Sequence, residues 1–245
     1  MKYIVANWKM HKTQKQSLAF VKQILPRIKT KRTIVLCPPY TDICPIAPLL
    51  KKTNIRLGAQ DVFYETRGAF TGEISPLMLK ELNVKYVLIG HSERRSILHE
   101  NNRLINQKLR ACLKHSLTPI LCIGETGLQR RLGQASHVLR NQLLTALKGT
   151  HKLKNIIIAY EPLWAIGSHT PDTPENAEKT NEFIRSVLAK SSSAATAKKI
   201  PILYGGSVTP RNAPSFLKKA AIDGLLAGHE SLLPGHFVKI ANCAP

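Results

Sequence analysis

The stretch Ile156–Tyr160 has the sequence IIIAY, and Glu161 and Pro162 follow it directly. Apolar and polar side chains do not alternate in this run, so both faces of the corresponding strand are expected to be buried. Strands buried on both faces are typical of a parallel sheet that is covered by helices. The stretch therefore predicts an α/β fold in which a carboxylate stands at the carboxyl end of a buried strand.

Similar short runs without clean alternation recur along the whole chain, which has 245 residues. They are Tyr3–Ala6, Thr33–Cys37, Ile55–Ala59, Tyr86–Ile89, Thr118–Ile123, Ile200–Tyr204 and Ile222–Ala227. With the first stretch they make eight predicted strands. Between them lie predicted helices, which have apolar residues at spacings of three and four. The clearest are Gln14–Ile28, Asn101–His115, Gln134–Leu147, Glu175–Lys190 and Pro210–Lys219.

Strands that alternate with helices indicate either a closed barrel or a doubly wound open sheet, and periodicity alone does not separate the two. Thr13 and Thr173 are predicted N-caps, and Pro174 suits a first helical position. The segment Ser191–Ala197 is interpreted as a flexible connection rather than a domain boundary. We therefore expect one domain over residues 1–245.

The composition favours a soluble protein of a reducing compartment. No stretch of about 18 apolar residues could span a bilayer, and Met1–Trp8 becomes polar too early for a secretory signal. The five cysteines are scattered and lack the paired spacing of metal sites. Reduced thiols and a cytoplasmic location are expected.

The formal net charge of +21 favours anionic partners, whether phosphorylated metabolites, nucleic acid or anionic membranes. Lysine and arginine are spread through the chain in ones and twos, whereas a nucleic-acid-binding arm would be a denser block. Association with nucleic acid or membranes is therefore a hypothesis that no motif supports. The charge could instead steer an anionic substrate toward the protein.

Reactive residues follow four of the predicted strands directly. These segments are Asn7-Trp8-Lys9, Gly90-His91-Ser92-Glu93, Glu161-Pro162 and Gly205-Gly206-Ser207. In a parallel barrel the carboxyl ends of all strands meet on one face, where active sites form. Taken singly, each residue has a structural explanation, such as a strand-end carboxylate that is paired with a lysine. Together they predict one site.

The segments that carry these residues resemble the signature segments of the triosephosphate isomerases, and they occur in the same order. They are ANWKMHKT from Ala6, GAFTGEISP from Gly68, LIGHSERR from Leu88, AYEPLWAIG from Ala159 and YGGSV from Tyr204. The resemblance covers essentially the whole chain. It implies a (β/α)8 TIM barrel, with eight parallel strands surrounded by helices. It also implies the reversible interconversion of dihydroxyacetone phosphate and D-glyceraldehyde 3-phosphate, in glycolysis and gluconeogenesis.

The resemblance also implies roles for the residues that follow the strands. Glu161 would be the base that moves a proton between two carbons, and Lys9 and Asn7 would stabilise the negative oxygen of the enediolate. Triosephosphate isomerases are a known example of a neutral histidine that acts as an electrophile, a role implied here for His91. Glu93 would hold Lys9 by an ion pair. No metal or organic cofactor is implied.

Two further loops are expected to bind the substrate phosphate. Ser207 and Gly228 follow the last two strands, where barrels often bind phosphate. Gly167 and Ser168 belong to a segment that resembles the closing lid of the family.

The chain departs from the usual family pattern at His169 and Pro171 in that lid, and at His229 in the phosphate loop. The backbone N–H of His229 can still bind phosphate if the loop does not require a positive φ at this residue. Histidine adopts a positive φ less readily than glycine.

The loop Gln60–Glu73, with Thr71 near its end, resembles the segment that family members insert beside Asn7 and His91 of a second subunit. A homodimer is therefore expected. Two alternatives remain: another phosphate-binding barrel, such as a synthase or epimerase, and a protein that uses its basic surface to bind nucleic acid or membranes.

Overall fold

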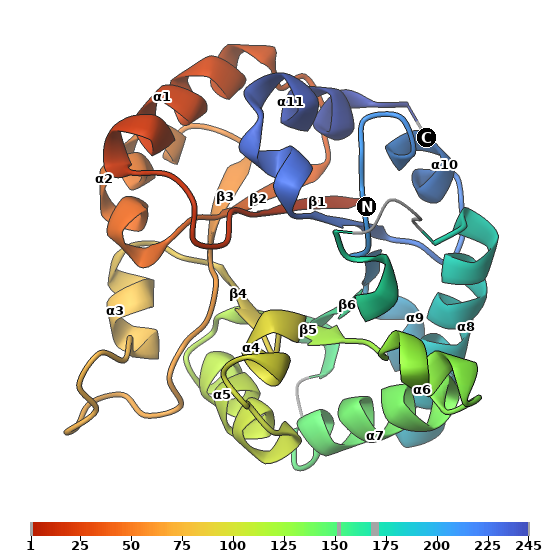
Figure 1. The fold of residues 1–245 in the computed structure, drawn as a ribbon. Helices are drawn as coiled ribbons and strands as arrows, with labels where there is room; N and C mark the ends of the chain where they lie inside the picture. The colour runs from red at the N-terminus through yellow and green to blue at the C-terminus, as the bar shows by residue number, and fades with distance from the viewer. Residues whose placement is uncertain (1, 151–152, 168–171, 245) are drawn as a thin grey trace.

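The computed structural model describes residues 2–150, 153–167 and 172–244. Its centre is a closed barrel of eight parallel strands in sequential order, with β1 paired to both β2 and β8. Helices surround the strands in an outer ring (Figure 1). The (β/α)8 barrel is thereby confirmed, and the open sheet is excluded by the pairing of Tyr3–Ala6 with Gly224–Ala227.

The strands lie close to the predicted runs. They are β1 Tyr3–Asn7, β2 Thr33–Cys37, β3 Ile55–Ala59, β4 Tyr86–Ile89, β5 Thr118–Ile123, β6 Ile157–Tyr160, β7 Ile202–Tyr204 and β8 Gly224–Ala227. The last two begin two residues later than predicted. Pro201 and Asp223 come directly before them; the Asp223 side chain accepts a hydrogen bond from Ile202 N at 3.0 Å.

The strands are buried on both faces, as their sequences predict. Inward-pointing residues form one apolar cluster that fills the barrel, and it includes Val5, Val35, Ile120 and Leu203. A larger cluster lies between the strands and the helices and includes Phe20, Phe216 and Phe237. Because both sides are covered, the barrel is rigid enough to hold polar side chains at the strand ends in fixed positions.

The helices match the predictions in part. The long ones are α1 Gln14–Ile24, α2 Tyr40–Leu50, α5 Asn102–Lys114, α7 Ala135–Leu147, α8 Pro174–Ser191 and α11 Pro234–Asn242. The short ones are α3 Pro76–Glu81, α4 Ser92–Ser96, α6 Gly127–Arg131, α9 Ala194–Lys199 and α10 Ala213–Leu217. Short 3₁₀ turns also occur: η1 Leu25–Arg27, η2 Leu153–Asn155, η3 Leu163–Ala165 and η4 His229–Leu232.

Three predicted segments differ from the structure. The helix predicted over Pro210–Lys219 is shorter, with only Ala213–Leu217 helical. The segment Ser191–Ala197 is not a flexible connection, because α9 begins within it and the Ser193 hydroxyl caps that helix by accepting from Thr196 N at 3.1 Å. The helix predicted over Gln14–Ile28 ends at Ile24, where Pro26 tightens the chain into η1.

The predicted cap at Thr173 is confirmed. Its hydroxyl accepts from Asn176 N at 3.2 Å, and Pro174 begins α8.

Helix α2 was not among the clearest predictions because Pro45 and Pro48 lie inside it. Pro45 has no N–H to offer the carbonyl of Thr41, four residues earlier. The side chain of Gln14 supplies the missing donor, with Nε2 3.1 Å from Thr41 O. A contact from the neighbouring helix α1 therefore stabilises a helix that its own sequence disfavours.

A buried charge network anchors the loop Gln60–Glu73 to the barrel. Asp61 accepts from Lys108 Nζ at 2.6 Å and lies 2.9 Å from Arg94 Nη2. Glu100 contacts the same two cations. Burial raises the pKa of Asp61 to about 6, although Lys108 opposes the shift. The folded protein therefore holds a proton on Asp61 at pH values where the unfolded chain has lost it.

This shift predicts a stability contribution that disappears with rising pH. An acid whose pKa is raised in the folded state stabilises that state below its ordinary pKa, which is 3.8 for Asp61. The contribution is lost as the pH rises through about 6. Relative to Asp61→Asn, the free energy of unfolding of the wild type is expected to fall by on the order of 1–3 kcal/mol from pH 4 to 7. Urea denaturation at several pH values measures it.

Glu65→Gln, which removes an exposed carboxylate of the same loop, is the control for the loss of charge. A difference between wild type and Asp61→Asn that stays constant from pH 4 to 7 would contradict the assignment.

Candidate active site

One pocket at the carboxyl end of the barrel brings together residues from many parts of the chain. It has a volume of about 450 Å³. Of the predicted site residues, those that line it are Asn7, Lys9, His91, Glu161, Gly167, Ser207, Gly228 and His229. Glu93 lies beside it through its contact with Lys9. The exposed Thr71 does not line it, and Ser168, His169 and Pro171 lie outside the described residues.

Glu161 stands at the end of β6 and is only 1% exposed. Its Oε2 accepts a hydrogen bond from Ser92 N at 3.0 Å, at the first turn of α4. Its Oε1 has no hydrogen-bond partner among the described residues and lies 3.3 Å from His91 Nε2. A buried carboxylate with one uncommitted oxygen can accept a proton from a molecule that enters the pocket.

The space around Glu161 depends on glycines. A Cβ at Gly205 would lie 3.0 Å from Glu161 Cγ, and one at Gly124 would lie 1.8 Å from the carbonyl oxygen of Glu161. Any side chain at Gly124 would therefore displace the backbone that carries the carboxylate. The neighbouring thiol of Cys122 remains protonated, because burial and then the charge of Glu161 raise its pKa well above the ordinary value.

His91 caps the N-terminus of α4. Its Nδ1 accepts a hydrogen bond from Glu93 N at 3.3 Å. A ring nitrogen that accepts an N–H carries no proton, so this contact places the ring proton on Nε2. Nε2 is the nitrogen that faces Glu161. His91 can therefore donate a hydrogen bond to an oxygen atom of a ligand beside the carboxylate.

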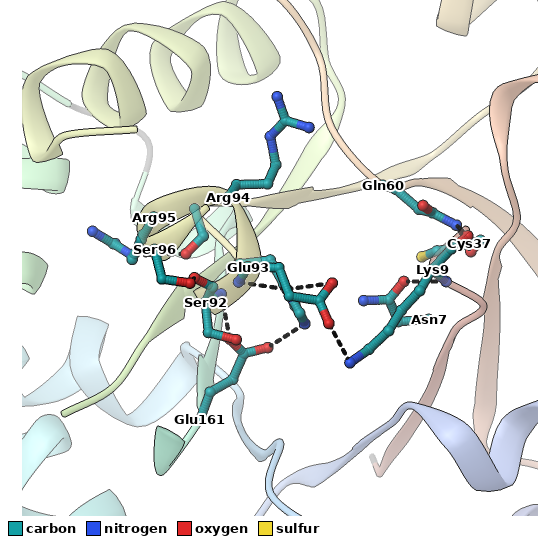
Figure 2. A network of polar contacts seen from close by, with 12 residues as sticks. Asn7, Lys9, Cys37, Gln60, Ser92, Glu93, Arg94, Arg95, Ser96 and Glu161 are labelled. Atoms are coloured by element: carbon teal, nitrogen blue, oxygen red, sulfur yellow. Dashed lines mark hydrogen bonds and ion pairs between the residues drawn. The ribbon is translucent and has the colours of Figure 1, made fainter. Parts of the chain in front are cut away.

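Lys9 extends into the pocket from the loop after β1, and its Nζ lies 2.5 Å from Glu93 Oε1 (Figure 2). Its φ is 51°, which costs a non-glycine residue roughly 1–3 kcal/mol. Two contacts hold this backbone: Lys9 N donates to Asn7 Oδ1 at 3.0 Å, and Gln60 Nε2 donates to Lys9 O at 2.8 Å. The strain fixes the direction in which the ammonium group points.

Gln60 is a site residue that the sequence analysis missed. Its Nε2 also donates to Cys37 O at 3.0 Å, so it ties the Lys9 loop to the end of β2. The signal available in the sequence was its position directly after β3, where the other strands carry their functional residues. Amide side chains at strand ends are too common to be selected on that ground alone.

The loops after β7 and β8 form the far side of the pocket. Gly228 lies next to Lys9, because a Cβ on it would be 3.5 Å from Lys9 Cε. His229 begins η4 and does not adopt a positive φ. The histidine in place of a glycine is therefore compatible with this backbone, and its N–H remains available at the start of a helical turn. Ser207 O accepts from Asn212 Nδ2 at 2.9 Å, which fixes the other loop.

A second buried carboxylate anchors the start of the segment after β6. Glu125 is fully buried, and its Oε1 accepts from Trp164 Nε1 at 3.0 Å, Arg130 Nη1 at 3.0 Å and Tyr160 Oη at 3.1 Å. Trp164 belongs to η3, which leads to Gly167 with φ 65°. The contacts of Glu125 therefore fix the position at which this segment leaves the barrel.

The whole chain has close relatives among known proteins. A family model described as triosephosphate isomerase matches residues 2–244. The triosephosphate isomerase of Thermoanaerobacter pseudethanolicus is 43% identical over 242 residues, 98% of each chain. That of Aquifex aeolicus is 45% identical over 240 residues, 97% of each chain. That of Dictyoglomus thermophilum is 43% identical over 245 residues, 98% of each chain.

Proposed function

This chain belongs to the triosephosphate isomerase family, and we propose that the pocket at the carboxyl end of its barrel carries out the reaction of that family. The protein is an isomerase that interconverts dihydroxyacetone phosphate and D-glyceraldehyde 3-phosphate, a step of glycolysis. The observation that carries the assignment of the pocket is the uncommitted Oε1 of buried Glu161, 3.3 Å from the Nε2 of His91.

In the proposed mechanism Glu161 removes a proton from C1 of dihydroxyacetone phosphate. The electrons of the broken C–H bond move toward the C2 carbonyl, whose oxygen becomes negative. His91 donates its Nε2 proton to that oxygen and takes a proton from the hydroxyl on C1. Glu161 then returns its proton to C2. Protons and charge balance, and the residues end in their starting states.

Electrostatic preorganisation supports this sequence of steps. The charge that develops on the substrate oxygen would lie near Lys9, Asn7 and the His91 N–H, which the fold holds in place before the substrate arrives. Donors fixed in a water-poor pocket stabilise developing charge more than water does, because they need not reorient. The phosphate is assigned to the N–H groups of Ser207, Gly228 and His229 opposite them, with Gly167 and Ser168 closing over it.

Isotope exchange tests the mechanism. A proton held on the Glu161 carboxylic acid can exchange with solvent before it is returned to the substrate. Turnover in deuterated water is therefore expected to place deuterium on the carbon beside the carbonyl, which NMR of the product detects. Absence of deuterium even after many forward and reverse turnovers is the result expected of a direct hydride shift between the carbons, and it would contradict an exchangeable proton on Glu161.

A homodimer is part of the proposal. The loop Gln60–Glu73 extends outward beyond α3 (Figure 1). Within it, the rings of Phe63, Tyr64 and Phe70 pack on one another. The ring centroid of Phe63 lies 4.2 Å from that of Tyr64 and 4.6 Å from that of Phe70. Phe70 is nevertheless 40% exposed, and Met10 near the pocket is 95% exposed. A stiff loop with an exposed aromatic ring supports insertion into a second subunit.

Thr71→Arg tests the dimer. A long cation at the tip of the loop is expected to weaken the dimer by about tenfold or more, which corresponds to about 1.4 kcal/mol. Sedimentation of serial dilutions measures the dissociation constant. Ser136→Arg puts the same side chain on the exposed face of α7 and is the control. Equal dissociation constants for both variants would contradict the placement of Thr71 in the interface.

The location proposed for the protein is the cytoplasm. All five cysteines are free thiols, and burial raises the pKa of Cys37 and Cys112 above the ordinary range. Free cysteines are typical of reducing compartments. Among the described residues, no helix has both the length and the apolar character needed to cross a membrane.

A further inference from the structure

The barrel topology places many of the exposed lysines of this chain at one end. Every segment that connects a helix to the next strand lies at the amino end of the strands, opposite the pocket, because all strands are parallel. Exposed lysines gather in these connections. Lys29, Lys31, Lys51 and Lys52 lie in the connections to β2 and β3, and Lys198 and Lys199 form the end of α9, directly before the connection to β7. None of these six lysines forms an ion pair among the described residues. Carboxylates are nearly absent nearby: Glu81 ends α3, and Asp223 in the connection to β8 pairs with Arg185.

At the carboxyl end, positive and negative charges are nearly balanced. Its loops contain cations such as Lys9 and Arg130, but carboxylates such as Asp61, Glu93 and Glu125 match them. Many of these charges form ion pairs with one another. The excess charge of the connecting segments therefore lies at the end opposite the pocket, which argues against a role of these residues in steering an anionic substrate.

Helix dipoles account for part of the basic end but not for all of it. A cation in the last turn of a helix stabilises that turn, but the effect is lost beyond it. Lys114 in α5, Lys190 in α8, and Lys198 and Lys199 in α9 occupy such positions. Lys29 and Lys31 follow the end of η1, and Lys52 lies beyond α2. Their accumulation without compensating carboxylates indicates an anionic partner.

A hollow at the same end has the charge of an anion site. It has a volume of about 460 Å³, and Lys2, Lys29, Lys31 and Arg32 line it. None of the described residues that line it is acidic. Its size admits a phosphate headgroup.

We propose that the amino end of the barrel is a docking surface for an anionic lipid membrane. The connections to all strands lie around one end of a barrel, so a flat anionic surface can meet many of them at once. Each lysine near an anionic leaflet adds roughly fivefold to the affinity. A nucleic-acid duplex is a narrow rod and would contact only a stripe of this end.

The side chains at this end fit a lipid surface better than nucleic acid. Single-stranded nucleic acid is held by aromatic rings that stack on bases. Tyr3 and Tyr86, the rings at this end, are half-buried and pack against each other edge to face at 6.5 Å. No large apolar side chain is exposed in the described helix-to-strand connections. The protein therefore adsorbs on headgroups without inserting, and salt reverses the binding.

The docking surface stays open in the proposed dimer. The residues assigned to the subunit contact, Met10, Phe70 and Thr71, belong to loops at the carboxyl end. The pocket also opens there and remains accessible to substrate when the amino end meets a membrane.

Vesicle cosedimentation of the purified full-length protein tests this surface. Wild type is expected to bind vesicles that contain phosphatidylserine and not to bind vesicles of phosphatidylcholine alone. Bound protein is expected to dissociate at about 1 M salt, where the screening length is about 3 Å. Changing Lys29, Lys31, Lys51 and Lys52 to Gln together is expected to weaken binding by roughly 600-fold. Isomerase activity, retained in that variant, shows that it is folded.

The matched control removes the same charge from the helices nearer the carboxyl end, by changing Lys15, Arg103, Arg131 and Lys179 to Gln; all four are exposed. It is expected to bind anionic vesicles nearly as tightly as wild type. Equal losses in both variants would show that only net charge matters and would overturn the docking surface. Absence of wild-type binding would do the same. Binding to a duplex RNA at the same salt without binding to vesicles would assign the surface to nucleic acid.

Discussion

Replacing Glu161 with aspartate is expected to lower kcat on the order of 100-fold or more, with a much smaller change in KM. The shorter side chain keeps the carboxylate but withdraws it by one methylene, and a misplacement of about 1 Å can cost a factor on this scale. Glu161 is 1% exposed and its Oε2 is tied to Ser92 N, so the carboxylate cannot easily move forward to compensate. Steady-state isomerisation of D-glyceraldehyde 3-phosphate measures both constants.

Glu161→Gln completes this test because it keeps the length and removes the basicity. We expect a loss of about 10²–10⁴-fold in kcat, the range of general base catalysis. The matched control is Glu125→Gln, which alters another buried carboxylate near the pocket that does not line it. A larger loss of kcat in Glu125→Gln than in Glu161→Gln would assign the base elsewhere.

The second large effect is expected for Lys9→Met. The variant keeps most of the volume and removes the ammonium group to which the proposed mechanism assigns stabilisation of the developing oxyanion. Loss of one such donor costs about 10²–10³-fold in kcat. KM for the phosphorylated substrate is also expected to rise, because Lys9 faces the Gly228 loop assigned to the phosphate. The same steady-state assay separates the two effects.

Lys12→Met is the control for Lys9. Lys12 lies in the same loop, also has a positive φ of 77°, and donates to Leu232 O instead of lining the pocket. Its replacement is expected to change kcat by less than about tenfold, since no contact of Lys12 reaches the pocket. Equal losses for the two variants would mean that loop conformation, and not the ammonium group of Lys9, supports the reaction.

Local sequence signals predicted much of the fold. The apolar runs placed the strands to within two residues, because a strand buried on both faces needs an uninterrupted run of apolar side chains. The cap at Thr173 is equally local. Contacts from distant residues were not predictable in this way: Gln14 supports the proline-containing helix α2, and β8 closes the barrel against β1.

The candidate site likewise has features that the sequence predicted and features that it did not. The sequence identified Asn7, Lys9, His91 and Glu161 as residues that follow strands, through their order and their resemblance to a family. It did not indicate that Gln60 holds the Lys9 backbone, or that the first turn of α4 binds one oxygen of Glu161 and leaves the other uncommitted. Such contacts depend on distances between side chains from different strands, which spacing along the chain does not encode.

The sequence by itself determined the strands and helices, the reactive residues at strand ends and the total charge of +21. The tertiary structure decided where that charge lies. Along the chain the lysines occur in ones and twos and show no cluster. A parallel barrel, however, brings every helix-to-strand connection to one end and every strand-to-helix loop to the other. Residues such as Lys31, Lys52 and Lys199, far apart in sequence, thereby share one face, opposite the pocket that contains Glu161.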